Sequence, residues 1–301
     1  MEENEKDLKN HDSEDLSSIF KFGAYKVKIR DIALGEDGSP RQFRIFEPND
    51  IESKVPVIHF LHGFKLKYTN YNDLLTHLSS HGFIVISSQS EHKLIGGDTT
   101  YEEAKKVFIF INWLKNNLSS KISVKPDFEN LGISGHSRGG KVTNRILNNN
   151  PDIAKSFFGL DPVDSAPPIF SSSDPKSLLD PVKFKGESMF LGTEKGPNGP
   201  LVFAPKGENS VNFYACFPSP SIHIIAKGVG HVDMMDESAC RFVRSVSANS
   251  GDKKLNSKFR AYCGGLMAAF FNSTLKGMKK YEKLIKDSSM HPFLTKLVEY
   301  K

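Results

Sequence analysis

The sequence predicts an α/β protein with a mostly parallel central sheet and helices on both of its faces. Two observations carry this prediction. From residue 55 to 161, apolar runs of strand length alternate with segments of helical spacing, which is typical of parallel strands joined by crossover helices. The apolar runs are also continuous, as expected of strands that are buried on both faces.

The elements follow in order along the chain. Residues 22–34 and 41–46 alternate apolar and polar side chains around a Gly-Glu-Asp-Gly turn at 35–38, which indicates a hairpin of two edge strands. Further strands are expected at 55–61, 83–86, 130–134, 153–160, 188–191 and 221–226. Helices are expected at 71–81, at 99–118 with Thr99 or Thr100 as the cap, at 138–149, near 239–247 and, as a long amphipathic helix, at 259–286.

The domain organisation follows from length and composition. Residues 19–301 are enough for one large domain. Residues 1–18 are charged and lack an apolar signal region, so we expect a disordered tail and no secretory signal. Residues 162–220 are rich in Pro, Ser and Gly and have little periodicity apart from one short strand, which predicts an irregular lid or pocket region.

Charge and cysteine content exclude several classes of function. The net charge of +5 is small for this length, and no basic run is interleaved with aromatic residues, so no nucleic-acid partner is expected. The three cysteines are odd in number and lack metal-ligand spacing, which predicts reduced thiols in an intracellular, soluble protein. The longest apolar stretch is too short to span a bilayer.

Gly135-His136-Ser137-Arg138-Gly139 carries the clearest chemical signal. A G-x-S-x-G pentapeptide between a strand and a helix places a serine hydroxyl on a sharp turn above the sheet edge, where it can attack an ester carbonyl. The same stretch nearly matches a phosphate-binding G-x-x-x-x-G-K loop, but Val142 stands where a hydroxyl would reach Mg²⁺. A plain turn without chemistry is the third interpretation.

Two later residues complete a nucleophilic constellation. A serine nucleophile needs a histidine base and an acid that orients it, and in α/β-hydrolases these follow in the order Ser, Asp or Glu, His. Asp161 ends an apolar strand and His231 follows a Gly-Val-Gly turn after a late strand, so both suit this order. Asp164, inside the following loop, is the rival acid.

An oxyanion hole requires two backbone N–H donors. We expect them at Arg138, which follows the nucleophile, and at Phe64, where Gly63 permits a close approach. This loop also weighs against the phosphate-loop interpretation, which has no use for it. His59 and His62 have metal-like spacing but no third ligand, so neither a metal nor a cofactor is expected. A catalytically silent binding protein of the same fold remains an alternative.

Longer segments around these residues resemble the chlorophyllases. They are FLHGF at 60–64, SHGFIV at 80–85, GHSRGGK at 135–141, GLDPVD at 159–164, GHVDMMD at 230–236 and CGGLMAAF at 263–270. The resemblance implies an α/β-hydrolase fold and a triad of Ser137, Asp161 and His231. It also implies hydrolysis of the phytyl ester of chlorophyll to chlorophyllide and phytol.

The same resemblance bears on location and partners. A chlorophyll substrate implies peripheral contact with pigment-bearing membranes, in the cytoplasm or at a plastid, although no targeting peptide and no partner protein are evident. The chain is more distantly similar to platelet-activating-factor acetylhydrolase and to polyesterase-like enzymes. A general carboxylesterase or lipase acting on another hydrophobic ester is therefore the alternative function.

Overall fold

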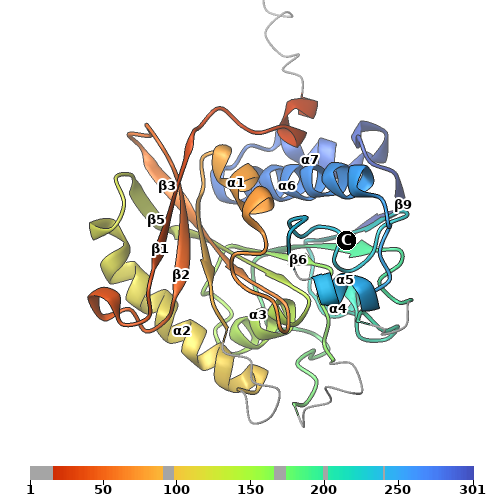
Figure 1. The fold of residues 1–301 in the computed structure, drawn as a ribbon, viewed down its shortest axis with the longest axis horizontal. Helices are drawn as coiled ribbons and strands as arrows, with labels where there is room; N and C mark the ends of the chain where they lie inside the picture. Colours follow the sequence, from red (N-terminus) through yellow and green to blue (C-terminus); the bar gives the residue numbers. More distant parts are fainter. Residues whose placement is uncertain (1–15, 91–97, 166–173, 199–202, 240) are drawn as a thin grey trace, which may run out of the picture.

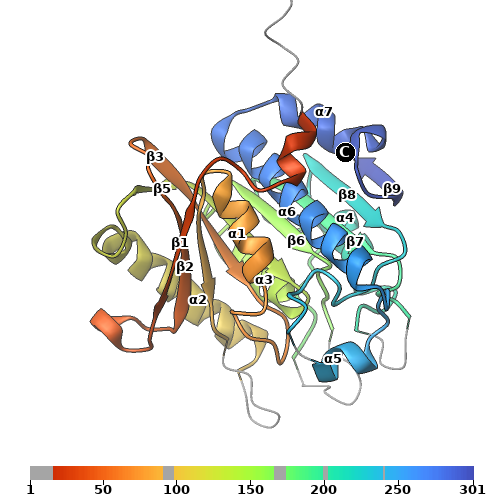
Figure 2. The ribbon, with the colours of Figure 1, turned by 45° about the horizontal axis from the view of Figure 1, so that its top comes forward.

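The computed structural model describes residues 16–90, 98–165, 174–198, 203–239 and 241–301. One nine-stranded sheet runs through this part of the chain in the order β1-β2-β4-β3-β5-β6-β7-β8-β9 (Figures 1 and 2). The strands from β4 across to β8 pair in parallel, whereas β1, β2 and β9 pair antiparallel. The predicted α/β class with a mostly parallel sheet is confirmed.

The strands are β1 Val27–Ile32, β2 Phe43–Pro48, β3 Lys54–Leu61, β4 Ile84–Ser88, β5 Lys125–His136, β6 Ser156–Leu160, β7 Glu187–Thr193, β8 Ser221–Ala226 and β9 Thr295–Tyr300. The α-helices are α1 Asn72–Ser80, α2 Thr100–Asn117, α3 Arg138–Asn149, α4 Ser210–Cys216, α5 Arg241–Val246, α6 Lys253–Lys276 and α7 Lys280–Lys286. Helix α2 begins with a capping box, in which Thr99 and Glu102 each bond the other's backbone N–H.

Helices cover both faces of the sheet, as predicted. Successive side chains of a strand point to opposite faces, and β3 shows the consequence. Ile58 and Phe60 belong to the core that contains α1, α6 and α7. Val57 and Leu61 belong to the core that contains α2, α3 and α4. Figure 1 shows α1 and α6 above the sheet and α2 and α3 below it.

The register aligns the carboxyl ends of the central strands at one edge of the sheet. Leu61 of β3 pairs with Gly135 of β5, and His136 of β5 pairs with Leu160 of β6. The loops that follow β3, β5 and β6 therefore leave the sheet side by side. Parallel sheets bind their ligands at this edge.

Several elements differ from the prediction. The late helix was expected at 259–286, but α6 begins at Lys253, capped by Asp252, and ends before Gly277, whose φ of 69° terminates a helix. A separate helix, α7, follows. Strand β9, which pairs with β8, was not predicted. Within the stretch 192–220, which we expected to be irregular, Asn209 caps the short helix α4.

The ends of two predicted regions lie outside the described residues. Of the expected tail at 1–18, residues 1–15 are not described, and residues 16–18 begin a 3₁₀ helix, Leu16–Phe20, whose Phe20 packs against α6. Part of the expected lid, residues 166–173 and 199–202, is also outside the described residues.

Candidate active site

Ser137 lies on the tight turn between β5 and α3, as the pentapeptide predicts. Its backbone has φ 55° and ψ −124°, a conformation that a non-glycine residue adopts only when the surrounding structure enforces it. An added Cβ on Gly135 would collide with the backbone of Gly139. An added Cβ on Gly139 would collide with the carbonyl oxygen of Leu61 on β3. Both flanking glycines are therefore needed for the turn to pack against the sheet.

The structure brings Ser137, His231 and Asp161 into one hydrogen-bonded chain. The Ser137 Oγ lies 2.8 Å from the His231 Nε2, and the His231 Nδ1 lies 2.7 Å from the Asp161 Oδ2. Because a carboxylate can only accept, the His231 Nδ1 carries the proton and its Nε2 is left to accept from the serine hydroxyl. His231 is 3% exposed and Asp161 is 2% exposed, so the base and the acid are shielded from water.

Asp161 is itself fixed by Thr193 at the end of β7. The Thr193 N–H donates to the Asp161 Oδ1 over 3.1 Å, and the Thr193 hydroxyl donates to the Oδ2 over 2.8 Å. Sequence reasoning missed Thr193, because nothing in its spacing singles it out. The rival acid, Asp164, accepts instead from the N–H and hydroxyl of Ser177 and from the N–H of Leu178, and so it anchors a loop.

The loop after β3 lies against the serine turn. An added Cβ on Gly63 would come within 3.1 Å of the Ser137 Cβ. The Gly63 N–H donates to the Tyr71 hydroxyl over 3.3 Å, so this N–H already has a side-chain acceptor. The Phe64 N–H stays a predicted donor of the oxyanion hole, and this proposal is developed below.

A buried hydroxyl links this loop to the histidine of the pentapeptide. The Tyr71 hydroxyl lies 2.7 Å from the His136 Nδ1, and the His136 Nε2 donates to the His231 carbonyl over 2.9 Å. Burial lowers the pKa of His136 well below its usual value, so the ring stays neutral and can accept at Nδ1. Tyr71 thus touches two of the three converging segments, a role that its sequence position at a helix start did not reveal.

Two aspartates hold the loop that carries His231. The Asp233 Oδ2 accepts from the N–H groups of Gly230 and Ser250, both over 2.8 Å. The Asp236 carboxylate accepts from the first N–H groups of α1, at Asn72 over 2.8 Å and at Asp73 over 3.0 Å. The cap of α1 therefore comes from a residue 164 positions further along the chain.

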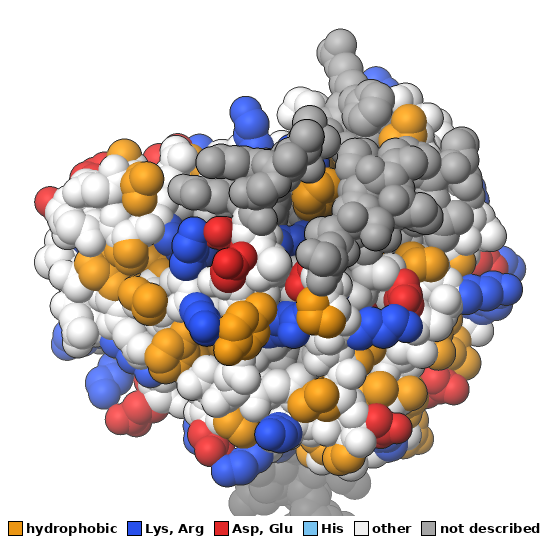
Figure 3. Space-filling view, turned by 90° about the horizontal axis from the view of Figure 1, so that it is seen from below, with side chains coloured by type: hydrophobic (Ala, Val, Ile, Leu, Met, Phe, Trp, Pro, Cys, Tyr) orange, Lys and Arg blue, Asp and Glu red, His pale blue; other side chains and the backbone are white. Residues whose placement is uncertain are grey.

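Aromatic and apolar side chains border this centre. The ring of Phe203 stacks on the His231 imidazole, with centroids 6.1 Å apart and planes 8° from parallel. Figure 3 looks at the lower face of the molecule in Figure 1, where hydrophobic side chains are interspersed with basic and acidic ones and no large area of one charge is visible.

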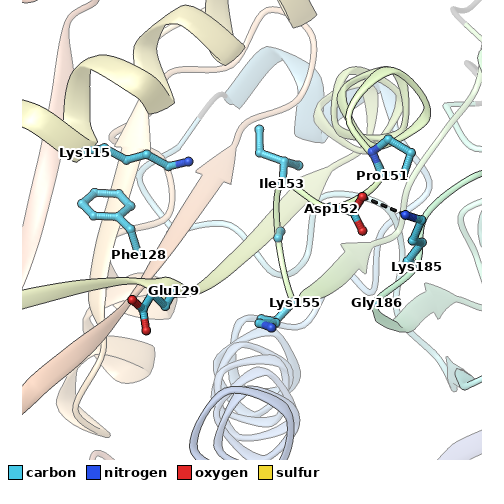
Figure 4. A pocket seen from close by; sticks show the side chains of 10 residues that line it. Lys115, Phe128, Glu129, Pro151, Asp152, Ile153, Lys155, Lys185 and Gly186 are labelled. Atoms are coloured by element: carbon cyan, nitrogen blue, oxygen red, sulfur yellow. Dashed lines mark hydrogen bonds and ion pairs between the residues drawn. The ribbon is translucent and has the colours of Figure 1, made fainter.

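A hollow lies at the edge of the sheet opposite to Ser137. It has a volume of about 550 Å³ and is lined by Lys115 of α2, by Phe128 and Glu129 of β5, and by residues just before β6 and β7 (Figure 4). Its Lys185 and Asp152 form an exposed ion pair over 2.8 Å. Because it opens at the amino ends of the strands, it takes no part in the constellation around Ser137.

The residues behind the metal-like spacing and the phosphate-loop interpretation have other partners in the structure. His59 bonds the Ser88 hydroxyl over 2.9 Å, whereas His62 bonds Ser90 and Gly63, so the two rings do not share a ligand. Lys141, the lysine of the phosphate-loop interpretation, is 4% exposed and lies 3.4 Å from Asp174. Its amino group is therefore held by a carboxylate beside α3.

The family follows from comparison with known proteins. A sequence model of the chlorophyllase family matches residues 15–301. This chain belongs to the chlorophyllase family. The chlorophyllases are α/β-hydrolases, so the predicted fold and the predicted class of carboxylic ester hydrolase are both confirmed.

The curated relatives match this chain along most of its length. Chlorophyllase-2 of Arabidopsis thaliana is 30% identical over 280 residues, which cover 86% of each chain. Chlorophyllase-1 of the same plant is 30% identical over 313 residues and 93% of each chain. Chlorophyllase type 0 of Chenopodium album is 27% identical over 95% of this chain and 87% of its own.

One further observation concerns membranes. In the part of the chain that the structure describes, no helix combines the length and the apolar composition that a bilayer crossing requires.

Proposed function

We propose that this chlorophyllase-family hydrolase cleaves the phytyl ester of chlorophyll to chlorophyllide and phytol through an acyl-enzyme on Ser137. The observation that carries the proposal is the chain from the Ser137 Oγ to the His231 Nε2, 2.8 Å, and from the His231 Nδ1 to the Asp161 Oδ2, 2.7 Å. Family membership supports an ester as the substrate.

In the first half of the reaction, the His231 Nε2 accepts the Ser137 hydroxyl proton while the oxygen attacks the ester carbonyl. The negative charge that develops on the carbonyl oxygen accepts hydrogen bonds from the N–H groups of Phe64 and Arg138. Arg138 opens α3, and the first N–H groups of a helix have no intrahelical acceptor. The imidazolium then gives its proton to the phytol oxygen, which leaves as the alcohol.

In the second half, His231 takes a proton from water, and the resulting hydroxide attacks the acyl-enzyme. Collapse of the second tetrahedral intermediate returns the proton to Ser137 and releases the carboxylic acid. Asp161 stays ionised throughout, because it stabilises the imidazolium and fixes its tautomer. Thr193 supports this role by donating two hydrogen bonds to the Asp161 carboxylate.

A hydrophobic leaving group agrees with the surroundings of His231. The leaving oxygen must lie within hydrogen-bond distance of the His231 Nε2 when it receives the proton. The Phe203 ring that stacks on this imidazole, with centroids 6.1 Å apart, therefore lies close to the first carbons of the alcohol. A phytyl chain, which is purely apolar, gains from burial against such a ring. We propose that the enzyme meets this substrate at a pigment-bearing membrane surface by peripheral contact.

Labelling with a fluorophosphonate probe tests the nucleophile. We expect stoichiometric labelling of the folded chain and its loss in Ser137→Ala. The exposed Ser120, which caps the end of α2 through the Asn117 carbonyl, supplies the control. Ser120→Ala should label as fast as the unchanged protein. Absence of labelling in the folded, unchanged protein would refute the nucleophile assignment.

Incubation with chlorophyll a tests the substrate. We expect chlorophyllide a and phytol to form, both resolved by reversed-phase chromatography, and neither to form with Ser137→Ala. Rapid turnover of p-nitrophenyl butyrate without any chlorophyllide would contradict the phytyl-ester assignment and favour a general carboxylesterase of the same family.

A further inference from the structure

A buried carboxylate contacts the side chain of the residue that follows Ser137. Glu103 lies in the first turn of α2, and its side chain is 2% exposed. The start of α2 is already capped by Thr99 and Glu102, so capping does not explain Glu103. Burying a charge is costly unless it is paired and hydrogen-bonded, so the partners of this carboxylate indicate what it does.

One oxygen of Glu103 holds the residue that follows the nucleophile. The Glu103 Oε2 accepts from the Arg138 Nη1 in a short, charge-assisted contact. The other Arg138 amino group donates to the Asp98 carbonyl over 2.9 Å, just before α2 begins. The Arg138 side chain is 13% exposed. Helices α2 and α3 lie side by side (Figure 1), so the guanidinium ties the start of one to the start of the other.

The other oxygen of Glu103 holds the segment after β4. Its Oε1 accepts a short hydrogen bond from the Ser90 hydroxyl, and the Arg41 guanidinium lies 3.7 Å from the same oxygen. Arg41 also donates to the Ser90 Oγ over 3.4 Å. Two guanidinium groups therefore surround one carboxylate, which offsets the cost of burying it.

Ser90 links Glu103 to the loop after β3 through hydrogen bonds. The Ser90 N–H donates to the His62 Nε2 over 2.9 Å, and the His62 Nδ1 donates to the Gly63 carbonyl over 2.9 Å. Burial lowers the pKa of His62 to about 4, so the ring stays neutral, and only a neutral ring can accept at Nε2 while it donates at Nδ1. The unbroken path runs from Arg138 through Glu103, Ser90 and His62 to Gly63.

We propose that Glu103 is a positioning residue that sets the separation between the two oxyanion donors, the N–H groups of Arg138 and Phe64. This inference rests on the proposed function and deepens it. Glu103 acts through the Arg138 guanidinium on one side and through Ser90 on the other. Donors of an oxyanion hole act only when both lie within hydrogen-bond distance of the developing charge. A buried link between the two segments meets that requirement.

Glu103→Gln tests the proposal, because it keeps the volume and removes the charge that holds Arg138. We expect kcat for p-nitrophenyl butyrate to fall about ten- to hundredfold, while KM changes less than about threefold, since the loss is confined to the transition state. An alkyl trifluoromethyl ketone, which forms an oxyanion when Ser137 adds to it, should lose affinity by the same factor as kcat. Glu129→Gln, an exposed glutamate at the opposite edge of the sheet, is the matched control and should change none of these values.

A double-mutant cycle identifies the path. If Glu103 acts through the Arg138 side chain, Arg138→Met lowers kcat to a similar degree, and the double variant is no slower than the slower single variant. Ser90→Ala removes only the hydroxyl link and leaves the backbone link to His62. It should reduce kcat and inhibitor affinity together by about three- to tenfold. If Glu103→Gln does not fold, Ser90→Ala tests the proposal in its place.

Different results would overturn the inference in distinguishable ways. All rates are expressed per active site, titrated with fluorophosphonate. If Glu103→Gln or Ser90→Ala lowers only the thermal midpoint and leaves kcat and the ketone affinity unchanged, Glu103 has a purely structural role. If the unchanged protein neither labels nor hydrolyses the ester, the proposed function fails and the inference fails with it.

Discussion

Tyr71→Phe is the sharpest test of how the converging loops are held. The substitution removes one oxygen and keeps the ring, which packs edge-on against Phe60 at a centroid distance of 4.8 Å. The Tyr71 hydroxyl accepts from the Gly63 N–H and donates to the His136 Nδ1. Its removal therefore leaves one donor and one acceptor without this partner in a fully buried position.

The expected cost follows from these two atoms. Removing one partner of a buried hydrogen bond costs about 1–3 kcal/mol for each group left behind, so we expect the two groups to cost about 2–6 kcal/mol together. An unfolding entropy of about 2.1 cal/mol/K per residue gives about 0.6 kcal/mol/K for 301 residues, and hence a midpoint lowered by about 3–10 °C. Because Gly63 precedes Phe64, the proposed oxyanion donor, kcat should also fall by roughly tenfold.

Thermal unfolding followed by circular dichroism measures the first effect, and ester hydrolysis per fluorophosphonate-titrated site measures the second. Tyr101→Phe is the control, because Tyr101 is 46% exposed and its contact with Lys105 involves the ring. It should shift the midpoint by less than about 1 °C. A Tyr71→Phe protein with an unchanged midpoint and unchanged kcat would show that the hydroxyl holds neither loop.

Three further predictions concern the same framework. Burial lowers the pKa of His59 from 6.5 to about 3, so below pH 6.5 the unfolded chain binds a proton that the folded chain does not, and stability falls as the pH drops toward 3. His59→Gln should reduce the slope of unfolding free energy against pH, measured by urea unfolding between pH 6 and 5, by about 1 kcal/mol per pH unit, and equal slopes for the two proteins would contradict this. Gly139→Ala places a Cβ against the Leu61 carbonyl, so it should lower stability by about 1–3 kcal/mol and abolish fluorophosphonate labelling. In the control Gly251→Ala the Cβ meets no atom within 4 Å, so this variant should lose only about 1–2 kcal/mol through backbone strain and keep its labelling. Asp236→Ala removes the cap of α1 and should lower the unfolding free energy, measured by urea unfolding, by about 0.5–2 kcal/mol. No measurable loss would mean that water replaces the carboxylate.

Local signals were sufficient to predict the central sheet. The run at 55–61 is uninterrupted and apolar, and β3 spans Lys54–Leu61. The start of α2 was predicted with Thr99 or Thr100 as its cap, and the structure has Thr99, paired with Glu102. Strand β9 lacked such a signal: Thr295–Tyr300 has no fully buried side chain, and its partners in β8 lie 69 to 78 positions earlier. Charged residues that continue after Lys276 hid the end of α6, which Gly277 sets.

In the candidate site, too, some residues could be predicted from the sequence and others could not. Ser137, Asp161 and His231 could be picked out because each follows a predicted strand, and the carboxyl ends of parallel strands meet at one edge. Thr193, Tyr71 and Glu103 could not, because their roles depend on which way a side chain points and on partners 32, 65 and 35 residues away. Spacing in the sequence carries no information about such pairs.

The cap that Asp236 supplies to α1 has a consequence for the order of folding. The loop bearing His231 is fastened to the start of α1 across 164 residues, and the Ser137–His231 hydrogen bond spans 94. Contacts between such distant segments form late, since a long stretch of chain must first lose its freedom. A growing chain therefore completes its serine turn well before it can assemble the base beside it. We expect the reactive hydroxyl to remain unactivated until the last third of the polypeptide has docked.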